Sequence, residues 1–438
     1  MLYYFRENIQ LYLILFVWII IGMISPILSY LIIPATLLLM YKKEMYEELL
    51  IGFLFILILS DSLEDSLVFA KNVKNIYVSL LAVFILFDSE KFQPINKLYS
   101  IFIPFFLFTF FTFSNSIQEP FVFASFQKTL SFAISFLVIP NFLIKIFRVN
   151  GELFFRRFIF FLIITLLAGI VLKYSAHNVA YLENGRYRGI FGNPNGVGIY
   201  SVLVFIAFFL LDDFFPRMFS RQERILFFVI IIYTIYLSGS RNAVIAILIF
   251  YFFQRFFSFS PFIGFIIFLF VLVLSEIISS NLVGIILALD LGDYFRIRTL
   301  EEGSGRYIAW DFAWKQIQQN FFIGKGFAYN EYYMRQNYHM LQKMGHQGGI
   351  HNSFLTFWMD QGLVGLIIYL RSYILMFVKA AKKTKYAFPI MFAISFTAFF
   401  ESWLVGSLSA YAFMGMFIFT IITSEEINSE NELILEPL

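Results

Sequence analysis

The sequence has no cysteine and only four histidines in 438 residues. Without cysteine, the chain can form no disulfide bond and perform no thiol chemistry. Charged side chains are also scarce: they make up 14% of the residues, against about 25% in soluble domains. The formal net charge is only +3, and so weak an excess of basic residues gives no indication of a nucleic acid partner.

What the sequence has instead is apolar residues, which make up 60% of the chain and include 62 Phe. Many apolar runs approach the roughly 17–25 residues that a helix needs to cross a bilayer. Runs such as LYLILFVWIIIGMI do not alternate with polar residues as strands of a membrane β-barrel do. The composition therefore predicts an all-α, polytopic integral membrane protein. The first run shows no small-residue cleavage site, so we expect a retained first helix rather than a signal peptide.

The apolar runs predict about 12 to 14 transmembrane helices, since the two short runs 49–60 and 75–88 can be half-spans. The runs lie near residues 11–25, 27–41, 49–60, 75–88, 99–113, 121–147, 157–172, 195–211, 225–238, 242–256, 262–280, 353–370, 386–404 and 408–423. If successive runs alternate in direction, four basic stretches fall on one side: 42–45, 145–157, 217–224 and 379–385. Lys and Arg concentrate in cytoplasmic loops, so we expect this side, and both termini, to be cytoplasmic.

The chain divides into an N-terminal transmembrane bundle (1–280), a long loop (281–350), C-terminal transmembrane helices (351–423) and an acidic cytoplasmic tail (424–438). Loops longer than about 12–15 residues usually carry function or are disordered. A second, shorter loop on the same outer face covers residues 173–193.

The long loop contains helix signals, beginning with Ser304 as a candidate N-cap. Side chains at steps of three and four then form one helical face: Arg306, Trp310, Ala313, Trp314, Ile317 and Phe321. A second helical piece is expected near 330–343. We predict a helical periplasmic lid, placed before the third-last transmembrane helix and packed on the membrane helices.

Polar candidates gather at this outer face, first in RYRGIFGNPNGVG. This stretch contains Arg186, Arg188, Asn193 and Asn195, and an apolar helix begins directly after it. The unpaired N–H groups of a helix start can hold an anion, so we predict substrate binding by these four residues. The alternative is a capped helix start beside two arginines that reach into the membrane interface.

Two further arginines begin helices on the same face. Arg241 follows the SGS turn, where the helix dipole disfavours a cation, and an ionisable residue near membrane depth suggests function. Its alternative is a side chain that extends to the interface. Arg306 lies one turn before Trp310 on the apolar face of the lid helix, so it should point inward. A salt bridge to Glu301 or Glu302 is the alternative for Arg306.

His351 occupies the first turn of an apolar helix, with Asn352 or Ser353 as the N-cap. We predict that Asn352 also belongs to the substrate-binding residues. The positive helix end favours a neutral imidazole, which can accept a proton from a hydroxyl group. A purely structural histidine is the alternative. Metal binding with His339 and His346 is disfavoured, since their spacing matches no familiar ligand pattern.

Taken together, these residues place several arginines and one histidine under an aromatic-rich lid. Guanidinium groups bind phosphate oxygens through paired hydrogen bonds. The combination predicts a site for a dianionic, lipid-linked phosphate substrate that enters from the bilayer.

The stretch HNSFLTFWMDQGLVG combines His351 and Asn352 with Gly362 and Gly365 at fixed spacing. It follows RGIFGNPN, SGSR and GSGR in order, and over residues 185–370 the chain resembles the O-antigen ligase/O-antigen polymerase superfamily. The resemblance implies a bacterial inner-membrane glycosyltransferase whose active site faces the periplasm and which uses no metal or other cofactor.

The implied donor is a glycan on undecaprenyl pyrophosphate, and the implied acceptor is lipid A-core or another glycan. The resemblance also implies contact with membrane lipid and with other polysaccharide assembly proteins. It assigns pyrophosphate binding to Arg241 and Arg306, acceptor activation to His351, and further substrate contacts to Arg188.

Ligases and polymerases share these motifs, and the match at 351–365 favours a ligase slightly. A lipid-linked oligosaccharide flippase is the alternative from another class, and a structural membrane component is a third. Flippases need charges buried in mid-span, whereas the acidic residues that we noted, Asp61, Glu64, Asp65 and Glu401, lie at the ends of apolar runs.

Overall fold

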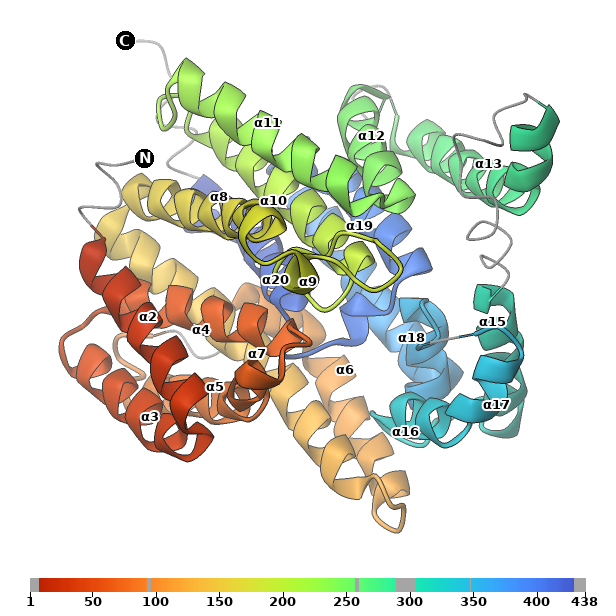
Figure 1. Cartoon of the computed structure of the whole chain (residues 1–438), viewed down its shortest axis with the longest axis horizontal. Helices are drawn as coiled ribbons and strands as arrows, with labels where there is room; N and C mark the ends of the chain where they lie inside the picture. The colour runs from red at the N-terminus through yellow and green to blue at the C-terminus, as the bar shows by residue number, and fades with distance from the viewer. Residues whose placement is uncertain (1–7, 93–95, 257–259, 289–304, 347, 429–438) are drawn as a thin grey trace.

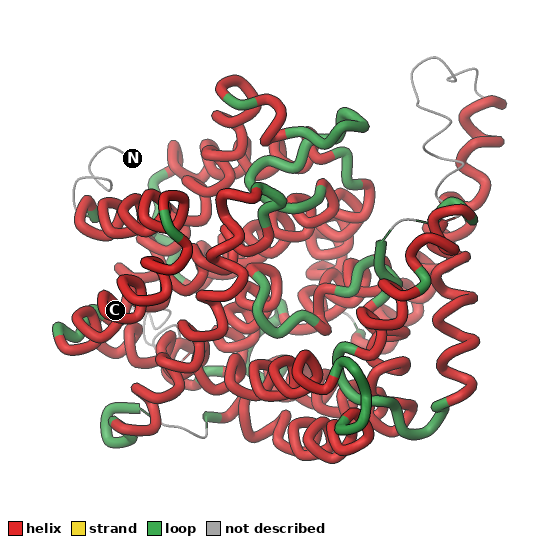
Figure 2. Tube along the Cα trace, turned by 60° about the horizontal axis from the view of Figure 1, so that its bottom comes forward, coloured by secondary structure: helices red, strands yellow, loops and turns green. Residues whose placement is uncertain are grey.

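The computed structural model describes residues 8–92, 96–256, 260–288, 305–346 and 348–428. Within these ranges every regular element is a helix, and the sole extended pairing is an isolated bridge between Tyr181 and Tyr187 (Figure 2). Six helices are long and apolar enough to cross a membrane. The prediction of an all-α, polytopic membrane protein is therefore confirmed.

A helix coincides with each predicted apolar run in the described part of the chain (Figure 1). These helices are α2 (Ile9–Ile24), α3 (Pro26–Lys42), α4 (Tyr46–Asp61), α5 (Val68–Phe87), α6 (Lys97–Phe113), α7 (Val122–Asn150), α8 (Glu152–Ser175), α10 (Pro194–Phe214), α11 (Arg221–Ser238), α12 (Arg241–Phe256), α13 (Pro261–Ala288), α18 (Ser353–Ala380), α19 (Ala387–Phe400) and α20 (Ala410–Thr423). Of the two short runs, α5 with its preceding turn spans Asp65–Phe87, long enough for a full crossing. Helix α4 is shorter but buried almost all round, as expected of a central helix that is apolar on every side.

The predicted basic stretches meet at one end of the bundle, which we call the basic end. Ion pairs join them to one another and to neighbouring segments there: Arg157–Glu47, Arg156–Glu223, Lys385–Asp213, Arg148–Glu426 and Lys383–Glu425. Because successive helices alternate in direction, the turns between α4 and α5, α8 and α10, α11 and α12, and α19 and α20 lie at the opposite end, the site end. All the candidate residues that the structure describes belong to the site end.

Residues 305–343 fold as three helices, α15 (Gly305–Gln319), α16 (Tyr329–Gln336) and α17 (Tyr338–Lys343). Figure 1 shows them together beside α18, and α15 packs directly on that helix. We call these three helices the lid. The candidate cap Ser304 lies outside the described residues.

The buried face of α15 is formed by Ala309, Ala313 and Ile317. The predicted face also included Trp314, whose side chain is 37% exposed and packs edge-on against Trp358 at the rim. These buried side chains pack in one cluster with Met334 of α16 and Met359 of α18, whereas Trp314 covers the edge of the contact with α18.

Helix α18 is broken at Gly362, which has φ 72° and ψ 176°. The N–H groups of Leu363 and Val364 donate to the carbonyl oxygens of Phe321 and Phe322 in the segment between α15 and α16. Unpaired backbone groups are costly inside a membrane. The segment between α15 and α16 supplies hydrogen-bond acceptors for the two N–H groups that lose their helical partners at the break.

The lid is held at the same place by a buried carboxylate. Asp360 is fully buried, and its side chain accepts hydrogen bonds from the backbone N–H and the side-chain amide of Asn330, at 2.8 and 2.7 Å. Its carbonyl oxygen accepts from the N–H of Gly326. Nearby, Lys128 of α7 pairs with Glu331 of α16 at 2.5 Å. The lid is thus fastened to the membrane helices on both sides of the α18 break.

We expect Gly362→Ala to destabilise the protein strongly. The conformation of Gly362 is essentially limited to glycine, and strain of this kind costs about 1–3 kcal/mol. An added Cβ would also lie 2.4 Å from the carbonyl oxygen of Phe322 and 2.7 Å from the nitrogen of Gly324. Unfolding midpoints of the purified protein in detergent measure the loss.

The matched control for Gly362→Ala is Gly345→Ala. Gly345 also has a positive φ, 91°, but no atom lies within 4 Å of an added Cβ. Gly345→Ala should therefore be destabilised only by the strained backbone conformation, without an added clash. Equal losses in the two variants would show that the α18 break and the lid segment do not pack as described.

Candidate functional site

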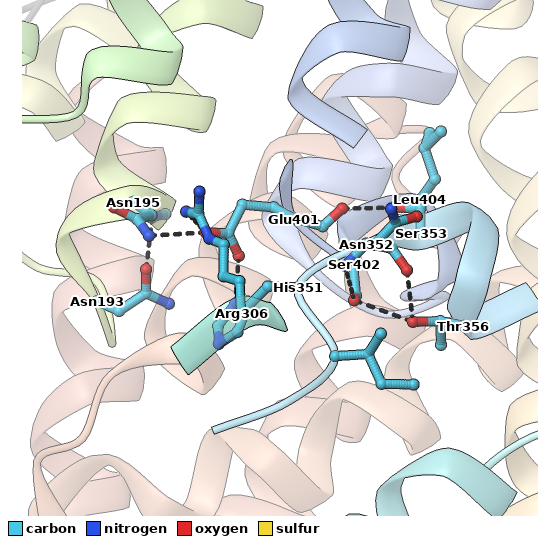
Figure 3. Close-up of polar contacts among 12 residues, drawn as sticks. Asn193, Asn195, Arg306, His351, Asn352, Ser353, Thr356, Glu401, Ser402 and Leu404 are labelled. Carbon is cyan, nitrogen blue, oxygen red and sulfur yellow. Dashed lines mark hydrogen bonds and ion pairs between the residues drawn. The ribbon is translucent and has the colours of Figure 1, made fainter. Parts of the chain in front are cut away.

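The candidate site is organised around Glu401, which directly follows the last residue of α19 (Figure 3). Its carboxylate is nearly buried, with 9% of the residue exposed. One oxygen, Oε2, lies 2.9 Å from Nδ1 of His351. The other, Oε1, accepts from the side-chain amide of Asn195 at 2.7 Å and lies 3.7 Å from the Arg306 guanidinium. One carboxylate therefore joins three of the predicted site residues.

His351 is positioned by the start of α18. Asn352 is the N-cap of that helix, and its side chain accepts from the backbone N–H groups of Phe354 and Leu355. This confirms the predicted cap and commits the Asn352 side-chain oxygen to the helix. His351 itself has a φ of 52°, uncommon for a residue with a side chain, so its placement is imposed by surrounding contacts.

Those contacts join the start of α18 to the segment after α19. The backbone N–H of Asn352 donates to Ser402 Oγ at 3.0 Å, and Ser353 Oγ donates to the carbonyl oxygen of Glu401 at 2.7 Å. The Ser353 hydroxyl also accepts from the N–H of Leu404. His351 and Glu401 are consequently held on two segments that are hydrogen-bonded side by side.

Three arginines from three different segments lie around this pair. Arg306, at the start of α15, stacks over the Phe400 ring at 5.6 Å. Arg186 donates to the side-chain oxygen of Asn195 at 2.9 Å. Arg241, the first residue of α12, lies within electrostatic range of both other arginines. The side chains of Arg306 and His351 are 31% and 32% exposed, so a ligand can reach them.

The charges of the site affect each other. Burial acts to raise the pKa of Glu401, but His351, Arg306 and the Asn195 amide outweigh it, so the pKa lies below its ordinary value of 4.5. Glu401 is therefore ionised at neutral pH. Burial lowers the pKa of Arg186, opposed by Glu401 and assisted by Arg306; an arginine nevertheless stays protonated in proteins.

A depressed carboxyl pKa has a definite consequence for stability. The stabilisation that Glu401 provides is fully present above its ordinary pKa of 4.5. It is lost only as the pH falls through the lower pKa of the folded state. The contacts around Glu401 therefore persist throughout the neutral and mildly acidic range.

Two predicted substrate-binding residues lie in other surroundings. Arg188 is 7% exposed, donates to the carbonyl oxygen of Val179 at 2.9 Å and pairs with Glu64 at 3.0 Å. The side chain of Asn193 caps α10 by accepting from the N–H of Gly196 at 2.7 Å. Asn193 thus has the capping role of the alternative interpretation, whereas Arg188 is buried in an ion pair instead of reaching into the interface. Substrate binding by either residue remains a prediction.

His339 and His346, the candidates for a metal site with His351, lie in different surroundings. His346 is buried, with its ring 6.1 Å from that of His351, whereas His339 is exposed beside Tyr338. Among the described residues, no group of three or more His, Asp or Glu side chains is placed to hold a metal ion. Glu301 and Glu302, the alternative partners of Arg306, lie outside the described residues.

Sequence reasoning noted Glu401 only as a residue at the end of an apolar run. It nevertheless carried a signal, since it is the sole acidic residue between 386 and 423. An ionisable side chain isolated among membrane segments is a candidate for function. What the sequence could not show was which of the other turns it contacts.

Six helices that can cross a membrane define a multi-pass membrane protein. A histidine, a carboxylate and three arginines gather at one end of its helices. A family model described as O-antigen ligase matches residues 226–370. Over these residues the chain is similar to the O-antigen ligase/polymerase superfamily, whose members are glycosyltransferase-like ligases and polymerases. No curated protein sequence matches the chain.

The matched region contains Arg241, Arg306, His351 and Gly362, whereas the motif RGIFGNPN (188–195), which also contributed to the resemblance, lies before it. Glu401, Arg186 and Asn195 lie outside it. The structure therefore extends the candidate site beyond the matched region, to the turn before α10 and the turn after α19.

Proposed function

We propose that the protein transfers a glycan from undecaprenyl pyrophosphate to an acceptor hydroxyl, as an O-antigen ligase that delivers the chain to lipid A-core. The proposed location is the bacterial inner membrane, with the site end facing the periplasm and the basic end facing the cytoplasm. The basic loops at one end of the bundle support this orientation.

The observation that carries the proposal is the arrangement of Arg186, Arg241 and Arg306 around His351. Two adjacent phosphates carry several negative charges, and guanidinium groups recognise their oxygens in a planar, paired geometry. The positive charge of the arginines also stabilises the charge that develops on a departing pyrophosphate. A histidine at the same place supplies the proton acceptor that a sugar hydroxyl requires.

In the proposed reaction the acceptor oxygen attacks the anomeric carbon from the side opposite the pyrophosphate. A new carbon–oxygen bond forms while the bond between that carbon and the phosphate oxygen breaks. The bonding electrons leave with undecaprenyl pyrophosphate, and the hydroxyl proton passes to His351. Attack from the opposite face inverts the anomeric configuration.

Deleting the gene should distinguish ligase from polymerase. If the protein is a ligase, finished long chains accumulate on the lipid carrier, because the step that removes them is missing. If it is a polymerase, single repeat units accumulate instead. Extraction of the lipid-linked pool and separation by chain length gives the answer, and re-expression of the intact gene restores the normal pattern.

The flippase alternative would require charged residues in mid-span that take part in transport. Asp360 in α18 and Lys128 in α7 are charged residues within predicted spans, which the sequence interpretation overlooked. They contact the lid residues Asn330 and Glu331 rather than each other across a pathway. This favours a fastening role over transport. A flippase deletion would trap lipid-linked units on the cytoplasmic side, where periplasmic glycosidase treatment of spheroplasts could not reach them.

A further inference from the structure

We infer that Glu401 is the positioning residue of the site: it fixes the His351 ring through Nδ1 so that Nε2 accepts the acceptor proton. Glu401 can act in this way only if the proposed function holds, because it works through His351. Neither the family match, which ends at residue 370, nor the sequence motifs assign it a role.

The 2.9 Å contact between His351 Nδ1 and Glu401 Oε2 determines which ring nitrogen carries the hydrogen. An ionised carboxylate accepts hydrogen bonds but cannot donate them. The hydrogen of a neutral imidazole must therefore be on Nδ1, which leaves Nε2 as the nitrogen able to take a proton. A carboxylate in this position also stabilises the imidazolium that forms when the proton arrives.

The other ring nitrogen of His351, Nε2, lies beside Gly348. A Cβ added to Gly348 would lie 2.9 Å from His351 Nε2. A glycine at 348 therefore keeps a side chain from pressing directly against this nitrogen. The nitrogen that Glu401 selects as the proton acceptor is the one that faces the glycine.

The second carboxylate oxygen of Glu401, Oε1, has partners other than the histidine. Glu401 Oε1 is held closely by Asn195, at 2.7 Å, but lies 3.7 Å from Arg306. Arg306 is thus only loosely paired and can turn to a phosphate without breaking the two short contacts of Glu401. The Glu401 carboxylate holds the His351 ring in place while the Arg306 guanidinium binds the phosphate of the donor.

A merely structural Glu401 would behave differently on substitution. If it served only to balance the charge of the arginines, its loss would disturb donor binding or folding. If it positions His351, its loss slows the chemical step. Removing a buried negative charge beside the arginines should, in addition, improve their attraction for a pyrophosphate rather than weaken it.

The test compares Glu401→Gln with the intact protein, using the purified full-length chain and an undecaprenyl-pyrophosphate-linked glycan as donor. We expect kcat to fall by about 10- to 100-fold, as is typical when a residue that orients a functional histidine is lost. The KM for the donor should stay unchanged or fall. Glu401→Asp, which keeps the charge but withdraws it from Nδ1, should retain more of the kcat than Glu401→Gln does.

Glu119→Gln is the matched control, because Glu119 is a carboxylate that pairs with Lys325 at 3.1 Å instead of with the histidine. An unchanged kcat in Glu401→Gln, or a raised donor KM with normal kcat, would overturn the inference. So would equal kcat values in Glu401→Gln and Glu401→Asp. If the glutamine variant fails to fold, Glu401→Asp decides the case alone: a kcat below that of the intact protein with an unchanged donor KM is expected, and an unchanged kcat would overturn the inference. Full activity in His351→Ala would instead refute the proposed function itself.

Discussion

Replacing His351 by alanine should abolish glycan transfer while the protein remains inserted and folded. General base catalysis by a positioned side chain contributes about 10²–10⁴-fold to rate, so the residual activity should be below detection in cells. The fold should tolerate the change, because His351 is only partly buried and Glu401 keeps its contacts with Asn195 and Arg306. Surface polysaccharide from a deletion strain that carries the variant measures the effect.

His339→Ala is the matched control for this experiment. His339 belongs to the lid, yet its side chain is exposed and lies against the neighbouring Tyr338. We expect normal surface polysaccharide from this variant at equal membrane content. Normal polysaccharide from His351→Ala as well would show that the histidine does not take part in the reaction.

Replacing Arg306 should give the second large effect, through the donor. A hydrogen bond to a charged group contributes about 1.5–3 kcal/mol, so we expect Arg306→Ala to lower kcat/KM by about 10- to 150-fold. Arg306→Lys should recover only part of this loss, because an ammonium group cannot form the paired contact with phosphate. Steady-state kinetics with varied donor concentration measure both variants.

The comparison for Arg306 is Arg335→Ala, an exposed arginine at the end of α16 in the same lid. It carries the same charge but lies outside the cluster formed with Arg186 and Arg241. Its removal should leave kcat/KM within about twofold. If both arginine variants lost activity equally, a general effect of lid charge would replace the specific phosphate contact.

The helices of this protein could be predicted from the sequence because hydrophobicity alone decides which segments enter a membrane. Each apolar run in the described part of the chain coincides with a helix, although α5 begins earlier and α13 and α18 end later than their runs. The lid helix α15 could also be predicted, although the position of Trp314 could not. Which side of an amphipathic helix is most buried depends on the shape of its neighbour, here α18.

The candidate site was only partly predictable. The alternation of membrane helices brings Arg186, Arg241 and His351 to the same end of the bundle, and this follows from chain order alone. The contact between Glu401 and His351 depends instead on lateral packing, since α18 and α19 could have been separated at that end. Likewise, Arg188 lies two residues from Arg186 but turns to Glu64, because the tight loop directs neighbouring side chains differently.

The hydrogen bonds at the break in α18 join segments that are synthesised at different times. The carbonyl groups of Phe321 and Phe322 accept hydrogen bonds from the N–H groups of Leu363 and Val364, which lie about 40 residues further along the chain. These bonds can form only after the later residues have been synthesised. Glu401, the partner of the histidine, emerges later still. Translation proceeds at about 5–20 residues per second, so for several seconds the nascent chain carries the arginines without a completed site.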